Sequence, residues 1–254
     1  MNVKEIVGHS EYKKGYFRRR RILRMLIIIT GLASIMLVVL TYYGHNAGNF
    51  VIKVSDSANR AIAISESFEG LTSNPQTRLQ TPAIRDASDM AYVNLDRDGA
   101  TRKDGAFVDR QFNYLAFTFY CMNVGQRTGT LVYSIRITEA VGSFDAGLRV
   151  MTIEEDSAGS TKEPIETVWR KFDPAINAGI AEEPDSWPLI FQKELDFESA
   201  QIVFTRDVQN FIVRDYRKFT IFVWLEGNDP DTTMDIRDGR VKLDMTLSIN
   251  PNDI

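Results

Sequence analysis

Residues 240–249, RVKLDMTLSI, alternate apolar and polar side chains without interruption. One face of the extended backbone is apolar and consists of Val241, Leu243, Met245, Leu247 and Ile249. A period of two predicts a β-strand with one buried face and one face in solvent. Residues 218–227, KFTIFVWLEG, are apolar on both faces, which predicts a strand in the centre of a sheet.

Seven further stretches have strand-like alternation: residues 49–55, 60–66, 113–123, 130–140, 148–155, 166–172 and 200–208. Between residues 113–123 and 130–140, the short connection VGQRTG supplies Gly125 and Gly129, which suit a hairpin. About nine strands, with no internal repeat and few helix-length patterns, predict a mainly β domain. We expect an antiparallel β-sandwich.

Three segments lack strand character and are longer than a hairpin needs: residues 68–89, 94–111 and 172–199. Loops of this length commonly carry function, so we expect them to form any binding face of the sandwich. Trp187, in the proline-rich third segment, is the best candidate for a contact residue. The alternative is a plain cap over one end of the sandwich.

Residues 25–43 contain no charged side chain. As a helix they would extend about 28 Å, close to the hydrocarbon thickness of a bilayer. Because basic residues stay in the cytoplasm, the arginines before this segment orient it; they are Arg18, Arg19, Arg20, Arg21 and Arg24. We therefore expect a cytoplasmic tail at 1–24, one transmembrane helix at 25–43 and an extracellular domain at 44–254. A cleaved signal peptide is the alternative.

The charge balance separates the two ends of the chain. The protein has 30 basic and 34 acidic residues. Residues 1–43 contain eight basic and two acidic residues, which leaves 22 basic and 32 acidic residues in the rest of the chain. A domain with a formal charge of −10 does not attract phosphates, which excludes a nucleic-acid partner. The expected partners are the lipid bilayer through the arginine run, and another cell-surface protein or a second copy.

Cysteine and histidine usage removes several kinds of chemistry. Cys121 is the only cysteine, and it is in phase with Leu115 and Phe117, which predicts a buried thiol and no intrachain disulfide. The two histidines, His9 and His45, precede the predicted domain body, so Ser-His-Asp triads and HExxH zinc sites are excluded there. We expect no enzyme and no cofactor; hydrolysis of cell-wall glycans by two carboxylates is the remaining catalytic alternative.

Two acidic stretches are candidate calcium sites. Asn94, Asp96 and Asp98 match the first half of a calcium-binding loop, but position twelve is Gly105, so the closing carboxylate is missing and a turn is the alternative. The stretch WLEGNDPDTTMDIRDG, residues 224–239, offers a second set. Its candidate ligands are Glu226, Asp229 and Asp231. Asp229 before Pro230 also predicts a helix N-cap, which gives the carboxylates a structural role.

The strand predicted at residues 49–55 is a candidate for association. Its apolar side chains Phe50, Ile52 and Val54 can complete the chain's own sheet or be donated to the edge of a neighbouring molecule. A helix ending near Tyr43 leaves a tether of roughly 20 Å before Phe50. This short tether favours self-completion.

Three stretches together resemble the camelysin and TasA-type group of exported bacterial proteins. They are the apolar leader ending in TYYGHNAGNF, residues 114–137 (YLAFTFYCMNVGQRTGTLVYSIRI) and residues 221–249, which contain WLEGNDPD. The resemblance implies a jelly-roll-like β-sandwich outside the membrane of a Gram-positive cell, with a role in surface or matrix architecture. Camelysins are described as metal-dependent proteases, but this chain has no zinc motif. The expected function is a membrane-anchored structural or interaction protein; a secreted matrix-fibre subunit is the alternative.

Overall fold

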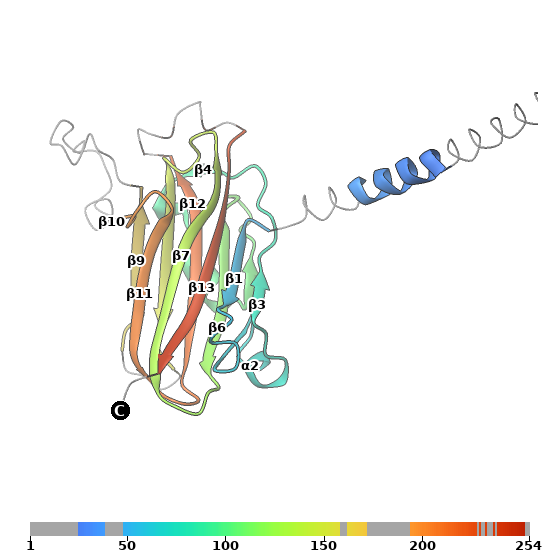
Figure 1. Ribbon diagram of the computed structural model, residues 1–254. Coiled ribbons are helices and arrows are strands. Elements are labelled where there is room, and N and C mark those ends of the chain that lie inside the picture. Colours follow the sequence, from blue (N-terminus) through green and yellow to red (C-terminus); the bar gives the residue numbers. More distant parts are fainter. Residues whose placement is uncertain are drawn as a thin grey trace, which may run out of the picture. The chain divides into compact units, whose positions relative to one another are not determined.

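The computed structural model describes residues 25–38, 48–157, 162–171, 194–227, 229, 232, 236 and 238–251. The chain divides into two compact units, residues 1–47 and 48–254, which are treated separately below (Figure 1). In the first unit, residues 25–38 form a helix whose residues are all exposed. Within the described residues, no helix has the length and apolar character needed to cross a membrane. The predicted span of 25–43 and its arginines extend beyond this helix, outside the described residues.

The second unit is mainly β and contains two sheets. The smaller sheet has the order β11-β7-β13-β1-β3. Its strands are β1 (Phe50–Val54), β3 (Arg78–Gln80), β7 (Gly129–Val141), β11 (Ile202–Phe211) and β13 (Arg240–Pro251). The alternation that predicted β13 is confirmed, because Val241, Leu243, Met245 and Leu247 are buried against the other sheet and Ile249 is half-buried, while the opposite side is more open.

The larger sheet has the order β10-β9-β8-β12-β6-β2, with β4 beside β12 and β5 beside β6. Its strands are β2 (Ile62–Ser65), β4 (Asp89–Met90), β5 (Gly105–Phe107), β6 (Leu115–Asn123), β8 (Leu148–Glu155), β9 (Ile165–Arg170), β10 (Leu195–Asp196) and β12 (Tyr216–Glu226). The two apolar faces of β12 place it between β8 and β6, as predicted. All nine predicted strands are present, with ends that differ by a few residues.

Two predictions about strand pairing are wrong. β6 and β7 do not form a hairpin: they belong to opposite sheets, and the residues between them cross from one sheet to the other. The sheets are also mixed, because β1 is parallel to β13, β10 to β9 and β4 to β12. Alternation specifies which face of a strand is buried but not which strand lies beside it, so neither outcome was visible in the local pattern.

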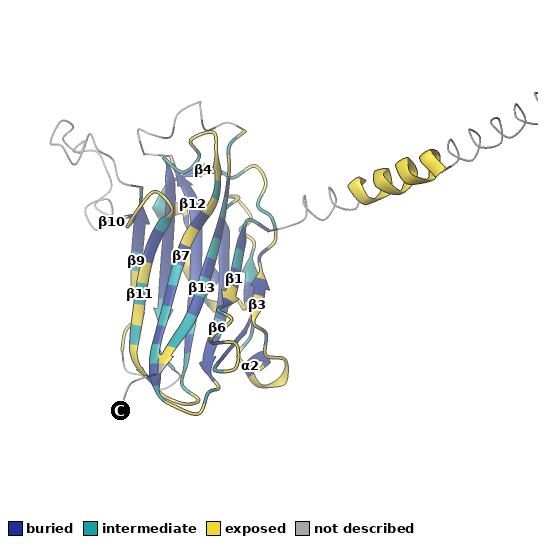
Figure 2. Ribbon diagram, in the orientation of Figure 1, coloured by how far each residue is buried: buried dark blue, intermediate teal, exposed yellow. Residues whose placement is uncertain are grey.

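The core lies between the two sheets (Figure 2). Aromatic rings connect them: Tyr133 of β7 meets Phe219 of β12 edge-on with centroids 5.0 Å apart, and Trp169 of β9 stacks on Phe204 of β11 at 4.0 Å. Cys121 is fully buried among these side chains, as predicted, and burial raises the pKa of its thiol. The free thiol is therefore a packing group in this fold.

A second apolar cluster covers the outer face of the larger sheet. The segment predicted to be an open loop at residues 94–111 contains α3 (Arg97–Arg102) and β5, and η1 (Tyr92–Asn94) begins just before it. Residues of this layer pack on Met151, Phe222 and Trp224 of the sheet. The segment is therefore a layer that packs on the sheet. Such a layer is needed because the outer faces of β8 and β12 are apolar and must be shielded from water. The segment at 68–89 contains α2 (Gly70–Ser73) and β3 and ends at β4.

Candidate functional site

The first candidate calcium loop is a helix start in the structure. Asp96 is the N-cap residue of α3, and its Oδ1 accepts a hydrogen bond from the backbone N–H of Gly99 at 2.8 Å. Asp98 lies in the first turn of α3, where a carboxylate favours the positive helix end. Asn94 belongs to η1, before the cap. Among the described residues, no group of three or more histidine, cysteine or acidic side chains is arranged to hold a metal ion.

The second candidate set leads to a buried charge cluster on the outer face of the larger sheet. The register places Arg149 of β8 opposite Trp224 of β12 and opposite Arg170 of β9. The Arg149 Nε donates to both carboxylate oxygens of Glu194, at 3.1 and 3.0 Å, and its Nη2 donates to Asp229 Oδ2 at 2.5 Å. We call Arg149, Glu194 and Asp229 the Arg149 cluster.

Neighbouring groups extend the Arg149 cluster along the sheet. Arg170 pairs with Asp196 at 3.5 Å on the β9 side. On the β12 side, Glu226 is 1% exposed, and its Oε2 accepts hydrogen bonds from Trp224 Nε1 at 3.1 Å and from the backbone N–H of Tyr92 at 3.0 Å. Glu226 therefore attaches the outer layer to the end of β12. Asp231, the remaining candidate ligand, lies outside the described residues.

Burial raises the pKa of Glu194 to about 7, although the guanidinium charges of Arg149 and Arg170 oppose the shift. The carboxyl therefore titrates close to neutral pH. Its oxygens are both within hydrogen-bond distance of Arg149, and its side chain is 0% exposed. The enclosed guanidinium of Arg149 holds Glu194 and Asp229 against the sheet. The chemistry of the Arg149 cluster is that of a structural ion cluster.

The candidate interaction residues on β1 face the chain's own core. Phe50 and Ile52 are 0% exposed and Val54 is 7% exposed. β1 lies between β13 and β3, with Phe50 opposite Leu243 and Ile52 opposite both Met245 and Leu79. The strand therefore completes the sheet of its own molecule in this structure. Trp187, the other interaction candidate, lies outside the described residues.

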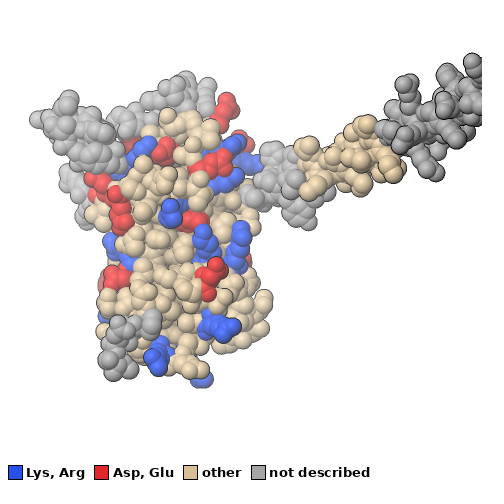
Figure 3. All heavy atoms as spheres, viewed as in Figure 1, with Lys and Arg blue, Asp and Glu red and all other residues tan. Residues whose placement is uncertain are grey.

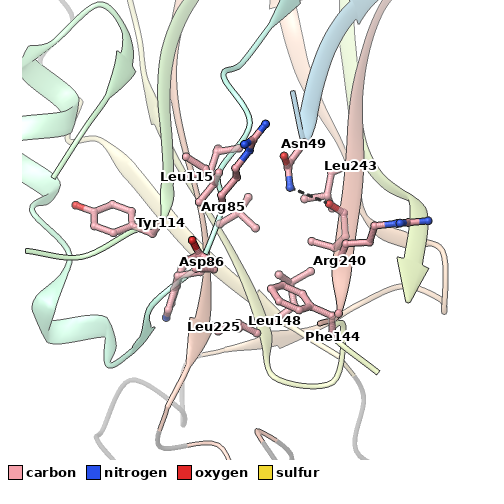
Figure 4. Close-up of a pocket in the computed structure, with 16 residues that line it drawn as sticks. Asn49, Arg85, Asp86, Tyr114, Leu115, Phe144, Leu148, Leu225, Arg240 and Leu243 are labelled. Carbon is pink, nitrogen blue, oxygen red and sulfur yellow. Dashed lines mark hydrogen bonds between the residues drawn. The ribbon is translucent and has the colours of Figure 1, made fainter. Parts of the chain in front are cut away.

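A pocket of about 180 Å³ opens between the sheets where β1 begins (Figure 4). Its apolar wall includes Leu115, Leu148, Val223, Leu225, Val241 and Leu243. Figure 4 shows Phe144 and Leu148 at one end and Arg85 and Asn49 at the other. Gly239 forms part of the wall: a Cβ there would lie 2.7 Å from the Ile236 carbonyl oxygen and 2.9 Å from that of Val141, so the close approach requires glycine.

The charged groups at the pocket are of both signs. Arg85 and Asp86 are exposed consecutive residues, and neither side chain forms an ion pair within the described part of the chain. Arg240 is different, because its Nε bonds Glu139 Oε1 at 2.6 Å and its guanidinium points away from the pocket in Figure 4. Sequence reasoning missed this pocket, since its walls come from strands and connections that are far apart in the chain.

The outer surface of the smaller sheet is polar and charged. Lys53 pairs with Asp244 at 2.5 Å, and Lys242 pairs with Glu139 at 2.7 Å. Charges of both signs are interspersed on the face of the domain in Figure 3, whereas residues 25–38 carry none. A mixed surface of this kind suits a folded domain in water.

Comparison of the chain with known protein families, with curated proteins and with solved structures found no match.

Proposed function

We propose that this chain is a single-pass membrane protein whose exterior domain has a structural or protein-interaction role at the cell surface. In this proposal residues 1–24 are a cytoplasmic tail, residues 25–43 cross the membrane, and residues 44–254 form an extracellular β-sandwich. The role is not enzymatic. Residues 46–254 contain no histidine, and the buried acidic residues Glu194, Glu226 and Asp229 are engaged by arginine, tryptophan or backbone donors.

The observation that carries the anchor is the exposure of the helix at residues 25–38. Its ten large apolar side chains are each between 55% and 68% exposed. Burying one such side chain is worth about 1.5–3 kcal/mol, so a helix of this composition is strongly driven out of water. A bilayer offers the matching apolar environment. The basic residues from Lys4 to Arg24 support an inside position for the amino terminus.

The layout of the domain supports a jelly-roll-like sandwich. After β6 in the larger sheet, the chain enters β7 in the smaller sheet and returns to β8 and β9 in the larger one. β11, β12 and β13 again alternate between the two sheets. Repeated crossing between facing sheets is typical of jelly rolls and Greek keys, whereas meanders keep successive strands side by side.

Protease treatment of intact cells tests the anchor and its orientation. The full chain carries one tag at Met1 and another after Ile254. We expect the carboxyl-terminal tag to be removed and the amino-terminal tag to survive until the cells are permeabilised. A variant with glutamine in place of the five arginines before the helix should insert in mixed orientations; they are Arg18, Arg19, Arg20, Arg21 and Arg24. A variant with glutamine in place of Arg60 and Arg127 should keep the wild-type orientation. Loss of the Met1 tag with protection of the other end would contradict the proposal, as would release of the whole chain by alkaline carbonate.

A further inference from the structure

The pocket beside β1 has the size and lining of a binding site for a small apolar group. An apolar cavity of about 150 Å³ is sufficient to hold benzene, and this pocket has about 180 Å³. The ring of Phe144 contributes to its lining together with leucine and valine side chains. A phenyl or branched alkyl group therefore matches both the volume and the chemistry of the walls.

The charged groups at the opening restrict which molecule can carry that apolar group. Arg85 supplies a guanidinium and Asp86 a carboxylate, and the charge of Arg240 is already paired with Glu139. A ligand with only a carboxylate would meet Asp86 as well as Arg85, and the predicted domain has a formal charge of −10. A ligand with only an ammonium group would meet the guanidinium of Arg85. A zwitterion can use both groups.

We propose that the pocket binds a free α-amino acid with an apolar side chain. The side chain occupies the space between the sheets, the carboxylate pairs with Arg85 and the ammonium group pairs with Asp86. This proposal goes beyond the surface role described above and does not depend on the membrane anchor. It makes the domain a carrier or sensor of small zwitterions in addition to a structural module.

Nuclear magnetic resonance of the full-length protein in uncharged maltoside micelles tests the proposal, with leucine and valine methyl groups labelled. The three probes share a phenyl group: phenylalanine, hydrocinnamate, which lacks the ammonium group, and phenethylamine, which lacks the carboxylate. We expect phenylalanine to shift the methyl signals of Leu115, Leu148, Val223 and Leu225 saturably. Each analogue should bind about tenfold more weakly or worse, because it leaves one charged partner unmatched.

Two conservative variants assign the charges. Arg85→Gln should weaken phenylalanine about tenfold and remove its advantage over phenethylamine, whereas Asp86→Asn should remove its advantage over hydrocinnamate. Asparagine tolerates the positive φ of 53° at residue 86, so the backbone is preserved. Arg60→Gln, in an exposed turn, is the matched control and should change nothing. The proposal is overturned by the absence of saturable shifts, by equal binding of all three probes, or by unchanged selectivity in both variants.

Discussion

Replacing Arg149 with methionine tests the role of the Arg149 cluster. Its side chain is 1% exposed, and those of its partners Glu194 and Asp229 are 0% and 10% exposed. Methionine retains much of the packing volume but not the charge. At pH 8 the variant leaves the buried carboxyl groups of Glu194 and Asp229 without the cation that they share, and loss of the guanidinium raises the pKa of Glu194 further.

The expected loss of stability follows from this burial. Removing one partner of a buried ion pair costs about 3–5 kcal/mol, because the remaining charge stays desolvated and unpaired. At the same pH Glu194→Gln alone should raise stability by up to about 3 kcal/mol, because burial raises the pKa of Glu194 to about 7 and its ionised form is therefore the less favourable one. In the Arg149→Met background Glu194 has lost its main cation, so the same change should stabilise the protein by at least about 2 kcal/mol more than it does beside Arg149.

Urea unfolding of the full-length protein in uncharged micelles measures these differences. Tryptophan fluorescence is a local reporter, because Trp224 lies opposite Arg149 in the sheet register. The free energies are comparable only if the slope with urea is the same for all variants. Arg97→Met is the matched control: Arg97 is 44% exposed and pairs with Glu166 at 3.2 Å, and loss of such a surface pair costs at most about 1 kcal/mol.

The size of the Glu194→Gln effect in the two backgrounds decides the outcome. If glutamine at position 194 has the same effect with arginine and with methionine at 149, the two side chains are not coupled and the cluster does not act as a unit. A cost of Arg149→Met no larger than that of Arg97→Met would likewise refute the reasoning.

Three further predictions follow from the same structure. Burial raises the pKa of Glu194 from 4.5 to about 7 in the folded protein, so the stabilising contribution of the protonated carboxyl is complete below about pH 4.5 and is lost as the pH rises through 7. In urea unfolding the wild type should lose up to about 3 kcal/mol relative to Glu194→Gln over that range. Parallel pH profiles of the two proteins would contradict this prediction. Phe50 is 0% exposed, so Phe50→Ala should lower the free energy of unfolding by about 3–5 kcal/mol. The control Lys53→Ala, at an exposed position of the same strand, should lower it by less than about 1 kcal/mol. Similar urea midpoints for the two variants would show that β1 is dispensable. Because Asp96 caps α3, Asp96→Ala should cost about 1 kcal/mol, and thermal melting should coincide in calcium and in chelator; a calcium-dependent rise that Asp96→Ala abolishes would reverse this prediction.

Local patterns in the sequence were sufficient for the elements of the domain. Alternation located the nine strands, and the two apolar faces of residues 218–227 identified β12 as a central strand. The phase of Cys121 with Leu115 and Phe117 predicted its burial. These features depend on which face of a strand is apolar, and an apolar side chain is driven from water whichever partner covers it.

Tertiary structure decided how the strands pair and what the charged residues contact. β1 lies parallel to β13 from the other end of the chain, and β6 and β7 separate into different sheets although five residues join them. Arg149 meets Glu194 and Asp229, which are 45 and 80 residues away in the chain. The pocket beside Arg85 is likewise formed by strands and connections from distant parts of the sequence. Strand pairing and ion pairing depend on distances between remote segments, and those distances exist only once the two sheets have packed together.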